Sequence, residues 1–148
     1  NMAVNKLSGL TVHEILTKAG EAPTRVDKVE VLREYNTLAL RDVLKGAYDD
    51  EVEFILPKGA PPYTSADPKS VPSNLNKQTK RFRYFVKGGP GENLAAVKVE
   101  MMFVKVLEAI HPDDAELIIK MKEKDLAGAY KGITKKLVAE AFPGLIVK

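Results

Sequence analysis

The sequence predicts an all-α fold: a compact single domain, residues 1–148, of six or seven helices with a long proline-rich loop. Three observations indicate this class. A broadly apolar segment at 93–110 has helical periodicity, capping motifs precede several shorter apolar runs, and five of the nine prolines gather between 57 and 72. A length of 148 residues suffices for one well-buried domain and is short for two.

The apolar segment 93–110 is predicted to be the central helix. One row of apolar residues recurs three or four positions apart: Leu94, Val97, Met101, Val104, Leu107 and Ile110. Further apolar residues widen this face: Val99, Met102, Phe103 and Val106. A helix so broadly apolar needs neighbours on several sides, so we expect shorter helices to wrap around it. The alternative is that its Met and Phe side chains bind an apolar ligand.

Shorter helices are predicted from caps and apolar spacing. Thr11 and Glu14 form a capping box for a helix that ends near Ala19, with Gly20 as its stop. The other predicted helices span about 24–35, 37–47, 112–124 and 134–142. The first three helices have brief connections and are expected to pack as antiparallel neighbours. Asp49 and Asp50 are expected to cap one further turn, which Pro57 ends.

The proline-rich loop at 57–72 is predicted to contain neither helix nor central strand, because proline fixes the backbone and removes a donor. In one interpretation it wraps the helices, with Tyr63 and Val71 as anchors. In the other it binds a partner protein through Pro61, Pro62 and Tyr63, since a stiff segment loses little entropy on docking.

The segment 73–91 is basic and aromatic, and its secondary structure stays open between helix and strand. Helix is favoured because no second strand is evident to pair with it. Residues 70–91 hold five cations and no acid, so the basic excess of the chain lies here. The cations alternate with three aromatics and form a candidate nucleic-acid site: Lys77, Lys80, Arg81, Arg83 and Lys87, with Phe82, Tyr84 and Phe85. The alternative is that the cations solvate a helix face while Phe82 and Phe85 anchor the segment in the core. The GGPG that follows lacks the spacing of a phosphate-binding loop and is interpreted as a turn that separates this segment from the helix after it.

Catalytic, metal and cofactor sites are not predicted. The chain has no cysteine, which excludes disulfides and thiolate chemistry. His13 and His111 are far apart in sequence, and with Asp113 and Asp114 they are interpreted as capping or surface residues rather than metal ligands. Neither a nucleophile elbow nor a Walker loop is present. No apolar run is long enough to span a bilayer and no secretory signal is evident, so we expect a cytoplasmic protein.

Several segments resemble a family of uncharacterised proteins encoded by large tailed phages, notably myoviruses of marine cyanobacteria. They are VLREYNTLALRDVLKGAYDD, LPKGAPPY, RFRYFVKGGPG, HPDDAELIIKMKEKD and GITKKLVAEAFPGLI, and the resemblance covers residues 24–146. It implies a phage protein that acts in the bacterial host cytoplasm or in the particle. It assigns no activity and no role to any residue.

Two classes of non-enzymatic function are favoured, and an enzyme stays open as a third, least favoured alternative. The first, which we favour from the sequence, is an accessory protein that binds a phage or host protein through the loop at 57–72. The second is an accessory protein that binds DNA or RNA through the cations at 77–87, with Tyr84 as a stacking group.

Overall fold

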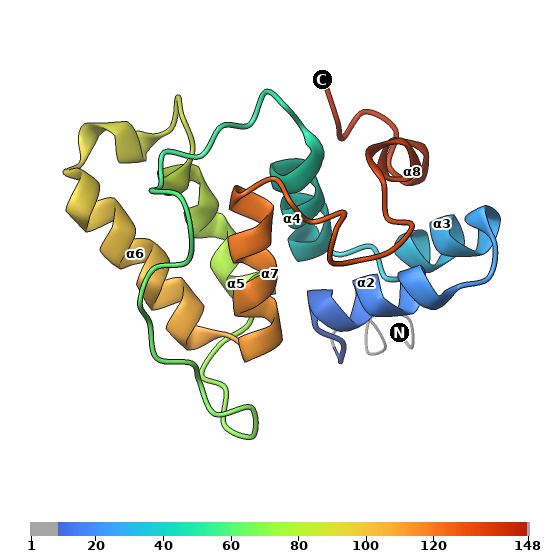
Figure 1. Ribbon diagram of the computed structural model, residues 1–148, viewed down its shortest axis with the longest axis horizontal. Helices are drawn as coiled ribbons and strands as arrows, with labels where there is room; N and C mark the ends of the chain where they lie inside the picture. Colours follow the sequence, from blue (N-terminus) through green and yellow to red (C-terminus); the bar gives the residue numbers. More distant parts are fainter. Residues whose placement is uncertain (1–8, 148) are drawn as a thin grey trace.

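Residues 9–147, which the computed structural model describes, form seven α-helices and two 3₁₀ helices (Figure 1). In chain order they are α2 Val12–Glu21, α3 Arg25–Glu34, α4 Leu38–Tyr48, α5 Leu75–Gln78, η1 Thr79–Phe85, η2 Pro90–Asn93, α6 Ala96–Ala109, α7 Pro112–Lys122 and α8 Lys135–Ala141. The β pairing of these residues is one isolated antiparallel bridge, Phe54 with Val86. The predicted all-α class is confirmed. None of the described helices is long and apolar enough to cross a membrane.

Side-chain caps define where the helices begin, as the sequence predicts. The capping box of α2 is complete: Glu14 N donates to Thr11 Oγ1 at 3.1 Å, and Thr11 N donates to Glu14 Oε1 at 2.9 Å. Thr24, Thr37 and Thr134 accept from the third backbone N–H of α3, α4 and α8 in the same way. These bonds satisfy donors that helix geometry leaves unpaired.

The centre of the fold is α4 rather than α6. Leu40, Val43 and Leu44 are completely buried, and α4 packs against α5, η1, α7 and α8. The buried hydrophobic side chains form one continuous cluster around it. The predicted central position of residues 93–110 is therefore wrong, because α6 lies at one end of the molecule (Figure 1) and packs against α7 and η1.

The apolar row chosen for α6 is also partly wrong. Val97 and Met101 are 64% and 57% exposed, whereas Val99, Phe103 and Val106 are buried. Apolar residues occur almost all round this helix, so their spacing does not identify the buried face. Only packing against α7 and η1 selects it.

Two expectations for the N-terminal helices also fail. Gly20 lies inside α2, which continues to Glu21, and a Cβ at Gly20 would approach the carbonyl oxygen of Lys131 to 3.3 Å. The glycine therefore permits a close approach of the connector between α7 and α8. The three helices do not form a consecutive antiparallel set either: α3 packs against α2 and α8, while α4 packs against α7.

The loop at 57–72 has no helix or strand, as predicted, and it is fastened to α6 and α7. Lys122, whose side chain is only 2% exposed, donates through Nζ to the carbonyls of Pro57 at 2.9 Å and Gly59 at 2.8 Å. Glu108 of α6 accepts from Thr64 N at 2.7 Å. The ring of Tyr63 packs against the core. These contacts agree with the interpretation that the loop wraps the helices.

Asp49 does not open another helical turn. Its buried carboxylate, 1% exposed, accepts from Lys45 Nζ at 2.8 Å, from Glu51 N at 2.9 Å and from Val147 N at 3.1 Å. Burial alone would raise the pKa of Asp49, but the hydrogen bonds outweigh it and hold the pKa well below its ordinary value. The chain then continues extended and pairs with the end of η1: Ile55 N donates to Phe85 O, and Lys87 N to Glu53 O, both at 2.8 Å.

Candidate functional site

The basic and aromatic segment forms α5 and then η1, so the favoured helical interpretation holds for most of it. Asn74 caps α5 by accepting from Lys77 N at 3.0 Å. After Phe85 the backbone becomes extended, and Val86 bridges to Phe54. The strand interpretation therefore holds only at Val86. The sequence does not reveal residues 53–55 as the segment that pairs with Val86. These residues follow Asp49 and Asp50, two possible helix caps, and therefore resemble a helical turn.

The three-residue repeat of η1 sorts its side chains into edges. Residues three apart eclipse one another in a 3₁₀ helix. Thr79, Phe82 and Phe85 share one edge and are all buried, at 3%, 9% and 0% exposure. Phe85 meets Phe103 of α6 edge to face, with ring centroids 5.3 Å apart. The inward edge anchors the segment, and Lys80 and Arg83 lie on a different, exposed edge.

All five predicted cations of this segment are exposed: Lys77, Lys80, Arg81, Arg83 and Lys87. Of these five cations, only Lys87 forms an ion pair with an acid among residues 9–147, at 3.6 Å from Glu53. Arg81 Nε donates to the side chain of Gln78 at 3.0 Å. The other four cations have no acidic partner in the part of the chain that the structure describes, which leaves the positive potential of this surface largely uncompensated there.

Tyr84, the predicted stacking residue, is half-buried against the core. The guanidinium of Arg83 lies over its ring, 5.1 Å from the centroid. Phe82 and Phe85 point inward. The aromatics of the segment therefore hold the cations in place, and they do not form a row of open rings on which bases could stack.

A groove of about 410 Å³ runs between the basic segment and α6. Its lining consists of Gln78, Arg81, Met102, Lys105, Val106 and Ala109. Lys105 is a cation that sequence reasoning did not place in the site, because its relation to Arg81 depends on how α6 packs against η1. The spacing of residues within either helix does not indicate how the two helices pack.

The glycines after the segment are explained by packing. A Cβ at Gly91 would overlap the carbonyl of Tyr84, and a Cβ at Gly89 would overlap that of Arg83. The backbone of GGPG thus lies directly against η1, and glycine is needed for that approach. This geometry agrees with the interpretation of GGPG as a turn that separates the basic segment from α6.

The predicted binding residues of the loop have mixed exposure. Pro61 and Tyr63 are half-buried, and Pro62 is exposed. The hydrogen bonds that Lys122 donates and Glu108 accepts tie this loop to α7 and α6, whereas the basic segment pairs with residues 53–55.

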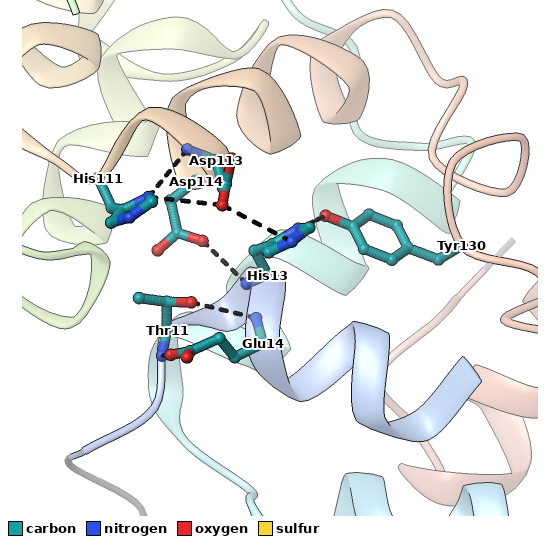
Figure 2. Close-up of polar contacts among 7 residues, drawn as sticks. All are labelled: Thr11, His13, Glu14, His111, Asp113, Asp114 and Tyr130. Carbon is teal, nitrogen blue, oxygen red and sulfur yellow. Dashed lines mark hydrogen bonds and ion pairs between the residues drawn. The ribbon is translucent and has the colours of Figure 1, made fainter. Parts of the chain in front are cut away.

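A second polar cluster joins residues that the sequence analysis had treated as separate caps (Figure 2). His111 caps α7 as expected, since its Nδ1 accepts from Asp113 N at 3.0 Å. The Asp113 carboxylate also lies 3.8 Å from a ring nitrogen of His13 and 3.8 Å from one of His111. His13 Nδ1 is 2.6 Å from the hydroxyl of Tyr130.

Asp114 connects this cluster to α2. Its carboxylate, 3% exposed, accepts from His13 N at 2.8 Å and so satisfies a donor at the N-terminus of α2 from α7. Burial raises the pKa of Asp114 above its ordinary value, against the hydrogen bond and the two histidines, which lower it. The sequence does not predict this contact, because 101 positions separate the two residues.

The cluster borders a cavity of about 420 Å³ that His13, Tyr130 and Asp113 help to line. Acids and lysines both occur around the cavity, including Glu116 and Lys120. No group of three or more His, Asp or Glu side chains among residues 9–147 is arranged to hold a metal ion. The hydrogen bonds and ion pairs of the cluster join α2, α7 and the connector that contains Tyr130.

Asp114→Ala should reduce the free energy of unfolding by about 1–3 kcal/mol at neutral pH, because the N–H of His13 loses its buried acceptor. The difference from the wild type should widen as pH falls toward 3.8, the ordinary pKa of the group. A raised folded-state pKa means that the native state binds the proton more tightly, and that contribution is lost as pH rises. Urea unfolding between pH 4 and 7 measures both effects.

Asp113→Ala is the matched control. Asp113 is exposed and its ion pairs are long, so its removal should cost less than about 1 kcal/mol. Equal losses for the two variants would contradict the role assigned to Asp114.

Comparison with known proteins gives a family for this chain. The family model described as "Family of unknown function (DUF6433)" matches residues 15–128, which run from α2 into the connector after α7. No curated protein and no solved structure matches the chain. The match covers most of the chain, and the protein therefore belongs to DUF6433, a family of unknown function.

Proposed function

We propose that the protein is a non-enzymatic accessory protein that binds DNA or RNA through the phosphate backbone. One observation carries the proposal: five exposed cations gather at 77–87, and four of them have no acidic partner within residues 9–147. These four are Lys77, Lys80, Arg81 and Arg83. Cations arranged in this way release the counterions condensed on a polyanion, which is the main source of sequence-independent affinity.

The geometry favours backbone contacts over base stacking. The two Phe rings of η1 are buried and one face of the Tyr84 ring is covered by Arg83. Short anchored turns restrict where the cations can lie, so little ordering should be needed on binding. We therefore expect weak preference for sequence.

A salt titration tests this function. Fluorescence anisotropy with labelled single-stranded and duplex DNA and RNA should give a log affinity that falls linearly with log salt. Four or five phosphate contacts predict a slope of about −3 to −5. Absence of binding at about 0.01 M salt, where charges interact over about 30 Å, would exclude the proposal.

A second candidate function is binding of a protein through the loop at 57–72. The supporting observation is that buried Lys122 and half-buried Glu108 hold the loop on α7 and α6, so that Pro61 and Pro62 are presented in a fixed conformation. Such preorganisation reduces the entropy lost on docking. The sequence favours this class, but the half-burial of Pro61 and Tyr63 leaves less exposed surface on the loop than the basic segment offers.

The resemblance to proteins of tailed phages supports a search for that partner in the cytoplasm of infected bacteria. Co-purification of the wild type and of a Pro61→Ala/Pro62→Ala variant is the test. A partner recovered equally by both would speak against this loop as the binding site.

A further inference from the structure

The outer side of α6 carries apolar and basic residues that no other part of residues 9–147 covers. Val97 and Met101 are the two exposed large apolar residues of this helix, at 64% and 57%. Lys98 and Lys105 are exposed beside them, since residues three, four or seven apart share one side of a helix. Glu108 lies on the same side, seven residues after Met101, but it is half-buried and its carboxylate accepts from Thr64 N at 2.7 Å. We call this surface the α6 ridge: Val97, Lys98, Met101 and Lys105.

A groove of about 430 Å³ between α2 and α3 has the complementary character. Its apolar lining comes from Ala22, Pro23 and Val31. Its charged residues are four acids and one base: Glu21, Asp27, Glu30, Glu34 and Lys18. We call this surface the α2–α3 groove.

The two surfaces lie at opposite ends of the longest axis of the molecule, α6 at one end and α3 at the other (Figure 1). They cannot meet within one copy. A contact between the ridge of one copy and the groove of the next would use different surfaces on the two copies. Such a head-to-tail contact repeats unless its rotation closes a ring.

We propose that the α6 ridge docks into the α2–α3 groove of a second copy of this chain. Val97 and Met101 would enter the apolar part of the groove, and Lys98 and Lys105 would face its acids. Both surfaces contain exposed apolar atoms and opposite charges, and the opposing charges would steer the encounter. The contact patches are small, so the association is weak, concentration-dependent and sensitive to salt.

Sedimentation velocity of the pure protein without nucleic acid tests this interaction. At about 0.01 M salt the average mass should rise with concentration beyond that of a dimer, and at about 1 M salt it should fall toward the monomer. Met101→Glu places a negative charge against the acidic groove, and Glu30→Lys places a positive charge against the ridge. Each should raise the dissociation constant at least about tenfold, because like charges in contact are costly.

Mixing the two variants separates head-to-tail contact from any other arrangement. Met101→Glu keeps an intact groove, and Glu30→Lys keeps an intact ridge. Their equimolar mixture should therefore form a 1:1 dimer that grows no further, although each variant alone stays monomeric.

Leu38→Glu is the control, because Leu38 is 56% exposed on a different helix, α4. It should leave association unchanged, and circular dichroism should show that all variants are folded. A wild type that remains monomeric at millimolar concentration in low salt would overturn the proposal. So would a closed dimer, or a mixture of the two variants that does not associate.

Discussion

Replacing Lys77, Lys80, Arg81 and Arg83 together with Glu should lower the affinity for nucleic acid by about 100-fold or more. Each lysine or arginine that contacts a phosphate adds about one unit to the salt slope, so the slope should fall close to zero in this variant. The side chains are exposed and their backbone is anchored by buried aromatics, so the fold should persist. Anisotropy titration against duplex and single-stranded DNA measures the loss.

A second quadruple variant with the same change in net charge provides the control. Its positions are exposed and lie outside the basic segment: Lys58, Lys69, Lys131 and Lys136. The affinity of this control variant for nucleic acid should fall much less. Binding is expected to depend on the charge at residues 77–87 and not on the net charge of the whole protein. Equal losses in the two variants would mean that net charge alone attracts the polyanion.

Phe85→Ala should reduce the free energy of unfolding by about 3–5 kcal/mol, the largest effect expected of a single substitution in the basic segment. Phe85 is fully buried, its ring meets Phe103 at 5.3 Å, and its carbonyl accepts from Ile55 N. Removing the ring opens a cavity where η1, α6 and residues 53–55 meet. Urea unfolding followed by circular dichroism gives the value.

Two milder substitutions serve as controls for Phe85→Ala. Phe85→Leu retains much of the volume and should cost less than about 1.5 kcal/mol if the site repacks. Tyr84→Phe changes the adjacent residue, whose hydroxyl accepts from Arg83 at 3.4 Å, and should have a small effect. A loss for Phe85→Ala no larger than that for Tyr84→Phe would show that Phe85 does not anchor the segment.

Local signals in the sequence predicted helix starts well. A Thr side chain three residues before a backbone N–H forms the same bond in almost any surroundings, so Thr11, Thr37 and Thr134 could be identified as caps. The irregular backbone of 57–72 followed equally from its prolines. These features depend on neighbours in sequence.

Features that depend on packing were not predicted. The outward position of Met101 reflects the choice of one face by a helix that is apolar almost all round. The contact of His13 with Asp114 depends on the docking of α2 against α7. Lys105 joins the groove beside Arg81 for a similar reason. In each case the missing information is the relative placement of elements distant in the chain.

The buried edge of η1 limits which changes in sequence this segment can tolerate. Substitutions at Lys80 or Arg83 leave Thr79, Phe82 and Phe85 in register with the core. An insertion or deletion of one residue between Thr79 and Phe82 would rotate the remainder by a third of a turn. The buried position of Phe82 would then be taken by Arg81 or Arg83, and Phe82 and Phe85 would leave the buried edge. Length is therefore more tightly constrained than composition along this turn.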